Sequence, residues 1–173
     1  ENNKLRELIN ETIQSEDVYA KVLVDKDSPY LKSIILNKGS KDNVKIGMAI
    51  VDKSYLVGKI IEVNYTNSRA LLLSDLNSKI PVLLEPMDIH AVLSGTGKNF
   101  GAIEYTKDEY KKKLTSNEII VYTSGYGELF KPGLPVGKII TNDLNRDNKV
   151  SFFSDFRQLD YVKIVSYEIG SGN

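Results

Sequence analysis

Two side chains in this sequence could carry acyl-transfer chemistry, the hydroxyl of Ser124 and the imidazole of His90, the single histidine. A serine becomes a nucleophile only when an oriented base takes its proton. In serine proteases built from two barrels, the histidine comes from the first barrel and the serine from the second, whereas both residues fall in the second half of this chain. We therefore expect no catalytic residue and a turn role for Ser124, with its hydroxyl bonded to nearby backbone.

Metal and cofactor sites are not predicted either. Asp88 is the only candidate ligand near His90, and a metal site needs more partners at ligand spacing. The absence of cysteine excludes thiol catalysis and thiolate metal sites. The pairs Gly95-x-Gly97 and Gly125-x-Gly127 lack the following helix and the Gly-Lys-Ser/Thr ending of a phosphate loop. We expect neither cofactor nor metal.

The charge balance argues against a nucleic-acid partner. Of 173 residues, 23 are Lys or Arg and 23 are Asp or Glu, so no global field attracts an anionic polymer. A small-barrel module that binds RNA or a polysaccharide would need exposed aromatic residues interleaved with Lys or Arg on adjacent strands. The ten tyrosines are scattered, so this module stays an alternative only.

Residues 1–16 show a helical pattern that is too short to be stable alone. We interpret it as the end of a coiled-coil helix that forms a dimer; the alternative is a helix docked on the domain. Its apolar face consists of Leu5, Leu8, Ile9 and Ile13. The chain begins at Glu1 within this pattern, and no apolar run approaches the roughly 20 residues of a membrane helix. We expect it to be a fragment of a longer protein.

After Glu16 the apolar pattern changes from helical to strand-like. About a dozen short runs of Val, Ile and Leu alternate with Gly, Asn, Asp and Ser turns, which predicts an all-β fold. A repeat divides these runs: Leu56–Ile61 (LVGKII) reappears as Pro135–Ile140 (PVGKII), and a Ser-Asp pair follows each copy, Ser74-Asp75 and Ser154-Asp155. The chain therefore reads as two similar β units.

We expect the first unit to span residues 17–85 and the second 86–167, with Pro86 at the join and a disordered tail at 168–173. A sheet of about six short strands would pair the exposed backbone groups of its edge strands by closing into a barrel. The predicted fold is all-β with a short N-terminal helix and two consecutive small six-stranded β-barrels of chymotrypsin-like topology. Three phenylalanines of the second unit occupy the positions of three leucines in the first, namely Phe152, Phe153 and Phe156 against Leu72, Leu73 and Leu76. This match favours a core role for the phenylalanines over a surface on which RNA bases stack.

The stretch Ile119–Ile140 holds the most elaborate turn of the chain. We predict structural turn or close-approach roles for six glycines, Gly39, Gly58, Gly125, Gly127, Gly133 and Gly137. In the loop Thr123–Pro135 we predict exposed apolar residues that contact a partner, namely Tyr126, Leu129 and Phe130. The alternative hypothesis to a binding protein is a chymotrypsin-like serine hydrolase or a degenerate relative of one.

These segments resemble the family of rod shape-determining proteins MreC. The resemblance covers about Glu1 to Ser166 and rests on the order of Leu36–Val44, Gly47–Val51, Leu56–Ile60 and the stretch Thr123–Ile139. Asn43 stands where the family usually has a glycine, but asparagine also tolerates left-handed backbone.

The resemblance implies a non-enzymatic scaffold of the bacterial cell-elongation machinery. It implies a single-pass membrane protein whose barrels lie on the extracytoplasmic face, anchored through a segment before Glu1. The implied partners are a class B penicillin-binding protein, RodA, MreD and MreB, together with a homodimer or higher self-association.

Overall fold

The computed structural model describes residues 17–27, 32–105, 118–126, 130–140 and 149–166. The predicted N-terminal helix and the C-terminal tail lie outside these residues. The described strands are β1 (Val18–Asp27), β2 (Lys32–Leu36), β3 (Ala49–Asp52), β4 (Tyr55–Val63), β5 (Ser68–Leu72), β6 (Lys79–Glu85), β7 (Ile89–Gly95), β8 (Phe100–Tyr105), β9 (Glu118–Thr123), β10 (Pro135–Ile140), β11 (Lys149–Phe152) and β12 (Tyr161–Val165). Two short 3₁₀ turns, η1 (Ser40–Asp42) and η3 (Phe156–Gln158), accompany them.

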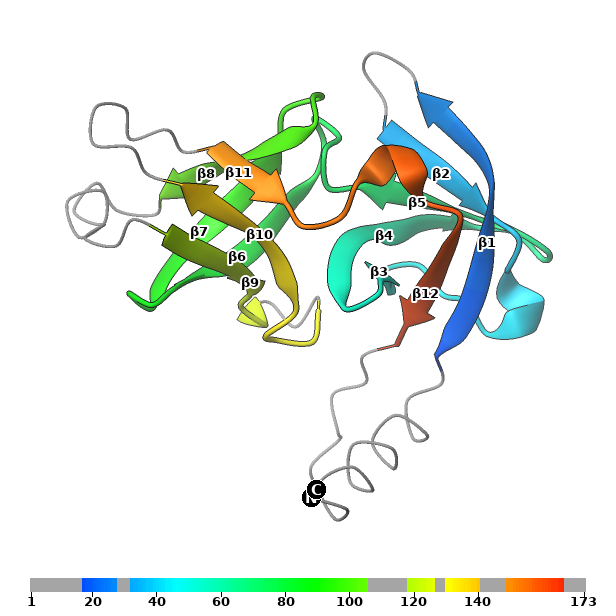
Figure 1. The fold of residues 1–173 in the computed structure, drawn as a ribbon. Coiled ribbons are helices and arrows are strands. Elements are labelled where there is room, and N and C mark those ends of the chain that lie inside the picture. Colours follow the sequence, from blue (N-terminus) through cyan, green and yellow to red (C-terminus); the bar gives the residue numbers. More distant parts are fainter. Residues whose placement is uncertain (1–16, 28–31, 106–117, 127–129, 141–148, 167–173) are drawn as a thin grey trace, which may run out of the picture.

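The strands form two closed barrels that lie side by side (Figure 1). The first barrel has the strand order β1-β12-β3-β4-β5-β2, and the second has β10-β11-β8-β7-β6-β9. Neighbouring strands are antiparallel throughout the described pairings. The all-β fold with two six-stranded barrels is therefore confirmed.

The barrels do not coincide with the two predicted units of residues 17–85 and 86–167, which is a correction. Strand β6 belongs to the second barrel, between β7 and β9, and β12 belongs to the first, between β1 and β3. These are equivalent places, because β1, β3 and β4 of the first barrel correspond in cyclic order to β7, β9 and β10 of the second. Each repeat unit thus gives its sixth strand to the other barrel, and residues 79–152 form one continuous insert in the first.

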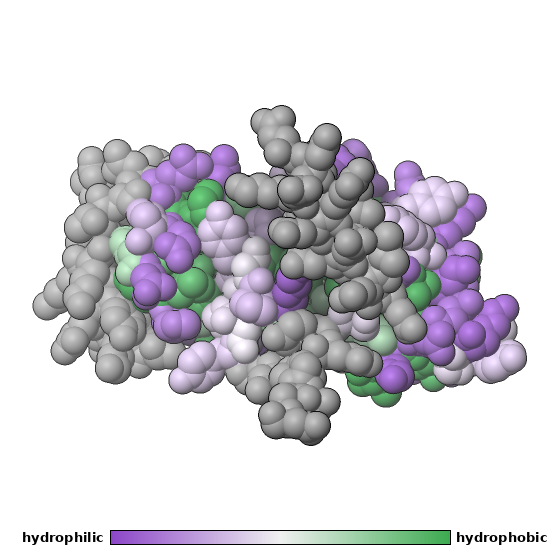
Figure 2. Space-filling view, turned by 90° about the horizontal axis from the view of Figure 1, so that it is seen from below, coloured by the Kyte–Doolittle hydropathy of each residue, from purple (hydrophilic) through white to green (hydrophobic). Residues whose placement is uncertain are grey.

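Alternation of buried and exposed positions explains why these segments are strands. In β6, Ile80, Val82 and Leu84 are buried, while the residues between them are partly exposed. Successive side chains of a strand point to opposite faces, so one face fills the barrel and the other meets water. Figure 2, which views both barrels from below, shows hydrophobic residues next to hydrophilic ones over each barrel. Among the described residues, no helix is both long and apolar enough to cross a membrane.

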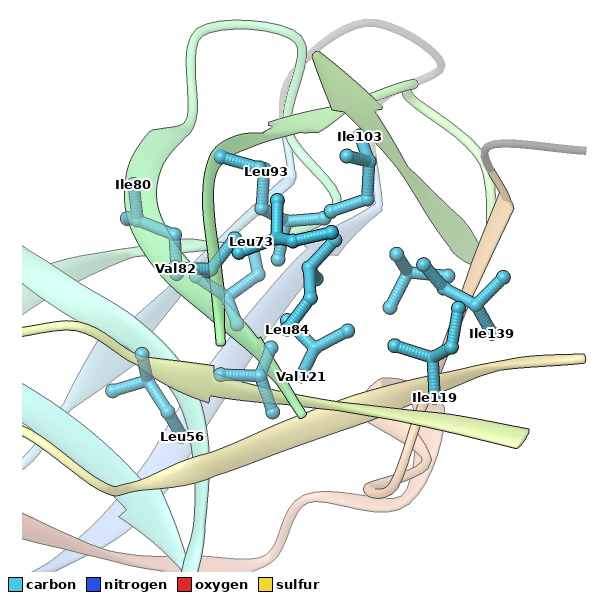
Figure 3. Close-up of a cluster of buried hydrophobic side chains, with 14 of the residues drawn as sticks. Leu56, Leu73, Ile80, Val82, Leu84, Leu93, Ile103, Ile119, Val121 and Ile139 are labelled. Carbon is cyan, nitrogen blue, oxygen red and sulfur yellow. The ribbon is translucent and has the colours of Figure 1, made fainter. Parts of the chain in front are cut away.

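The two barrels share apolar packing. The cluster that fills the second barrel also takes in Ala49 and Leu56 from the first, and Leu56 lies near Val121 (Figure 3). Phe156, in the connection from β11 to β12, packs against the core clusters of both barrels. Since these side chains are removed from water only when both barrels are in place, the barrels stabilise each other.

The repeated Val-Gly step makes the same bulge in each barrel. Val57 is skipped in the pairing of β3 with β4, and Val136 in that of β9 with β10. At the adjacent glycines a neighbouring strand comes close: a Cβ on Gly58 would lie 2.3 Å from the carbonyl oxygen of Leu71, and one on Gly137 would lie 2.3 Å from that of Ser151. Only glycine fits such an approach.

The Ser-Asp pairs form the two corners at which the chain crosses between barrels. Asp75 Oδ1 accepts a hydrogen bond from the Asn77 amide at 2.7 Å, and Asp155 Oδ1 accepts one from the Arg157 amide at 3.0 Å. The carboxylate of Asp155, which is exposed, also accepts from Arg157 Nε at 3.2 Å. The side-chain hydrogen bond from Arg157, followed by the backbone one, lowers the pKa of Asp155 below its ordinary value of 3.8.

The earlier turn around η1 depends on two further predicted residues. A Cβ on Gly39 would lie 2.2 Å from the Asn64 carbonyl oxygen, so the turn packs closely against the loop after β4. Asn43 has left-handed backbone, with φ 66°.

Candidate functional site

The loop between β9 and β10 is fixed to the barrel by Thr123. This buried side chain donates a hydrogen bond to the Lys131 carbonyl at 2.7 Å and accepts one from the Leu134 amide at 2.9 Å. The Gly133 amide, in a residue with φ +84°, donates to the Thr123 carbonyl at 2.9 Å. Gly125 has φ +73° and lies against Pro132. The loop therefore folds back on its own first residue.

Phe130 is not an exposed contact residue, which corrects the prediction. Its side chain is 2% exposed and belongs to the core cluster of the second barrel. The hydrogen bonds of Thr123 bring residues 130–134 back to the barrel, so the aromatic ring fills the core there. Two other predicted residues of the loop, Leu129 and Gly127, lie outside the described residues.

Tyr126 is the predicted contact residue that projects from the loop. It is 72% exposed, and its ring meets the ring of His90 edge to face, with centroids 5.6 Å apart. Ser124 stabilises the turn that carries Tyr126, because its hydroxyl oxygen accepts a hydrogen bond from the Tyr126 amide at 3.1 Å. The hydroxyl of Ser124 therefore serves the local turn.

A row of outward side chains continues from His90 across three strands of the second barrel. Leu83 of β6 is the direct cross-strand neighbour of His90 on β7 and of Tyr122 on β9. All three lie between buried residues and are themselves partly or fully exposed, so they share the outer face. Directly paired side chains of antiparallel strands have Cβ atoms about 5 Å apart. We call His90, Leu83, Tyr122 and Tyr126 the Tyr126 surface.

The predicted site residues did not include Leu83 and Tyr122. Both interrupt a run of buried residues in their strands, and the alternation of the sequence could have marked them as outward. What the sequence could not provide is the pairing of β6 with both β7 and β9, which brings them together with His90.

The Tyr126 surface is suited to contact rather than to catalysis. Its groups are two tyrosines, a leucine and an exposed imidazole, which combine apolar area with hydrogen-bonding ends. Aromatic residues of this kind are enriched at protein interfaces. Among the described residues, no three His, Asp or Glu side chains are grouped so that they could hold a metal ion.

Comparison with known proteins gives matches over most of the chain. The family model described as "Rod shape-determining protein MreC, barrel core" matches residues 22–166. The cell shape-determining protein MreC of Cereibacter sphaeroides is 34% identical over 149 residues, which are 86% of this chain and 48% of that protein. The chain spans about half the length of such curated relatives.

Solved structures show the same fold. The crystal structure of MreC from Pseudomonas aeruginosa matches with a TM-score of 0.73 and 24% identity, over 87% of this chain and 99% of that one. A complex between penicillin-binding protein PBP2 and MreC from Helicobacter pylori matches with a TM-score of 0.56 and 14% identity, over 87% and 99% of the respective chains.

Proposed function

Since this chain belongs to the MreC family of rod shape-determining proteins, we propose that it is a non-enzymatic scaffold of the bacterial cell-elongation machinery. Its barrels hold a class B penicillin-binding protein, and through it peptidoglycan synthesis, at the site of elongation. The observation that carries the proposal is the family match over residues 22–166, which covers both barrels.

The Tyr126 surface is the part of the described chain that we assign to the partner. Tyr126 is highly exposed; its backbone amide is bonded in the Ser124 turn and its ring packs against the His90 ring. An aromatic ring that is already packed loses less conformational freedom when a partner covers it, which favours binding. The complex of the Helicobacter pylori relative with PBP2 supports a partner of this class.

The rest of the assembly follows from the family. In the proposed arrangement a single membrane helix and a coiled coil precede the barrels, and the protein dimerises through Leu5, Leu8, Ile9 and Ile13. The barrels then lie on the extracytoplasmic face, where RodA and MreD are neighbours, and MreB is reached across the membrane. Restoring the preceding helix should make the protein a dimer by light scattering; a monomer at high concentration would contradict the coiled coil.

Replacing Tyr126 tests the partner surface. We expect Tyr126→Ser in the full-length protein to weaken binding of the class B penicillin-binding protein from the same organism by about tenfold or more, as loss of an exposed aromatic hot spot does. Binding is measured by calorimetry with purified proteins in detergent.

The matched control is Tyr65→Ser. Tyr65 is 71% exposed but lies in the turn between β4 and β5 of the first barrel, so its loss should leave affinity unchanged. Equal affinity of wild type and Tyr126→Ser would remove the Tyr126 surface from the interface. Failure of the wild-type protein to bind would contradict the scaffold proposal itself.

A further inference from the structure

A pocket of about 350 Å³ lies where the chain crosses between the barrels. Its walls include Lys98, Asn99, Phe152, Phe153, Ser154 and Phe156, and we call it the crossover pocket. Leu72 and Ser74, at the positions of the first repeat that match Phe152 and Ser154, line it as well. A volume of about 300 Å³ or more is in the range of small-ligand sites.

Ser154 and Asn99 are the uncharged polar residues of the pocket wall next to the phenylalanines. The hydroxyl oxygen of Ser154 is buried and has no hydrogen-bond partner. Because this oxygen lies beneath the pocket surface, it does not meet a ligand directly. The side-chain amide of Asn99, on the same wall, can both donate and accept.

Aromatic rings form another part of the wall. The rings of Phe152 and Phe156 lie 4.8 Å apart at 31°, and Phe153 stacks on Tyr55 at 5.1 Å. Phe152 and Phe156 are partly buried against the core, as predicted, and they also line the pocket. The prediction was wrong for Leu76, which is 50% exposed. The corresponding corner of the first repeat is built with leucine, so the corner alone does not require rings. The negative faces of such rings attract the weakly positive C–H groups of a sugar.

The charges around the pocket favour an anion. Lys32, Lys98 and Arg157 line it together with the single carboxylate of Asp155. Arg157 is paired with Asp155 at 3.2 Å and Lys32 has a partner of its own, so the positive charge open to a ligand is that of Lys98. Lys98 is exposed on the turn between β7 and β8, where its ammonium group can reach a ligand at the pocket mouth.

We propose that the crossover pocket binds an acidic sugar. A pyranose ring packs its C–H face on the phenylalanine rings, its hydroxyl or amide groups bond to Asn99, and its carboxylate pairs with Lys98. A simple anion would not use the rings, and a neutral sugar would not use the lysine. The inference rests on the pocket alone and does not depend on the scaffold proposal.

A pair of matched sugars tests this inference. N-acetylmuramic acid and N-acetylglucosamine share the ring and differ by the lactyl carboxylate. In an NMR titration of the ¹⁵N-labelled chain, we expect the acidic sugar to shift the backbone amides of Lys98, Asn99 and residues 153–157. The neutral sugar should bind about tenfold more weakly, because it lacks a charge-assisted hydrogen bond.

Three variants locate the site. Lys98→Glu should weaken the acidic sugar about tenfold or more, whereas Lys41→Glu, an exposed lysine of η1 on the first barrel, should not. Phe156→Leu copies the leucine of the first repeat and should also weaken binding. If this core-packed variant does not fold, judged by its amide spectrum, Lys98→Glu still decides the outcome.

Several outcomes would overturn the inference. They are no shift at the pocket, equal affinity for the two sugars, equal affinity of Lys98→Glu and wild type, and equally tight binding of inorganic phosphate at the same amides.

Discussion

Phe130 holds the returning half of the β9–β10 loop against the second barrel, because its ring is buried in the core cluster there. Replacing it with alanine leaves a cavity that the hydrogen bonds of Thr123 prevent the loop from filling. We expect Phe130→Ala to lower the free energy of unfolding by about 3–5 kcal/mol, measured by urea denaturation.

The control for this variant is Tyr126→Ser in the same loop. Because Tyr126 is exposed, its replacement should change stability by less than about 0.5 kcal/mol. A loss in Phe130→Ala as small as that in Tyr126→Ser would contradict the stabilising role of the buried ring.

Asp155 should make stability depend on pH in acid. Its folded-state pKa lies below the ordinary value of 3.8, because the ionised form accepts hydrogen bonds from the Arg157 side chain and amide. The stabilisation is therefore complete above the unfolded-state pKa and is lost as pH falls through the lower folded-state value. Wild type should exceed Asp155→Asn in stability at pH 6, and the difference should shrink below about pH 4.

The cause is tested by removing Arg157. In an Arg157→Ala background, the Asp155→Asn substitution should show a much weaker pH dependence in the same unfolding titration. A stability difference that stays constant from pH 6 to the acid end would contradict the role of the carboxylate charge.

At the level of single residues, the sequence predicted local hydrogen bonding better than the burial of a side chain. The turn role of Ser124 follows from local bonding, and the structure shows that bond to Tyr126. The exposure of Phe130 was wrong because its burial depends on a fold-back that Thr123 fixes through residues several positions away. Such a contact leaves no periodic signal in a loop.

Among the elements, the two Val-Gly bulges are predicted to be intolerant of any side chain. A methyl group at Gly58 or Gly137 would meet a backbone carbonyl of the neighbouring strand, and a backbone cannot turn aside as a side chain can. We expect Gly58→Ala and Gly137→Ala each to destabilise by about 1–3 kcal/mol, typical of overpacking.

Neighbouring Lys59→Ala and Lys138→Ala are the matched controls, since both lysines lie in the same strands at partly exposed positions. Thermal and urea unfolding of the four variants would decide the point. If the glycine variants match the lysine variants, the close approach has no energetic consequence.

The strands themselves could be read from the sequence. Short β-branched runs bounded by turn residues coincide with the strands of the structure, because each signal is local: alternation along a strand and glycine, asparagine or aspartate at its ends. The repeat also predicted equivalent roles for Gly58 and Gly137. Element boundaries and element type depend mainly on such nearby residues.

For the whole molecule, we predict a single cooperative unfolding transition. The barrels exchange β6 and β12 and share the side chains of Leu56 and Phe156, so neither can lose its structure while the other keeps its full core. Native-state hydrogen exchange should give the same opening free energy for the amides of Ile60 in the first barrel and Val121 in the second.

The contrary result is equally clear. If amides of the second barrel exchange through an opening of much lower free energy than those of the first, residues 79–152 unfold as a separate unit. In that case Leu56→Ala, which weakens the packing between the barrels, should not increase the difference between the opening free energies of the two barrels.

The exchange of strands is what the sequence could not predict. The sequence of a strand such as β6 is the same whether it closes its own barrel or the neighbouring one, because alternating apolar residues indicate only that one face of the strand is buried. Partner choice is decided by the closing of both barrels at once, and by the two Ser-Asp corners that carry the chain across.

The pairing of β1 with β12 also determines how the protein would carry tension. Val18 is paired with Ile164, so the two strands enter and leave the first barrel at the same end. A force applied between these points would peel the strands apart one hydrogen-bonded pair at a time, as a zipper opens. The second barrel lies outside this load path, so the Tyr126 surface would keep its shape under strain until β12 had detached.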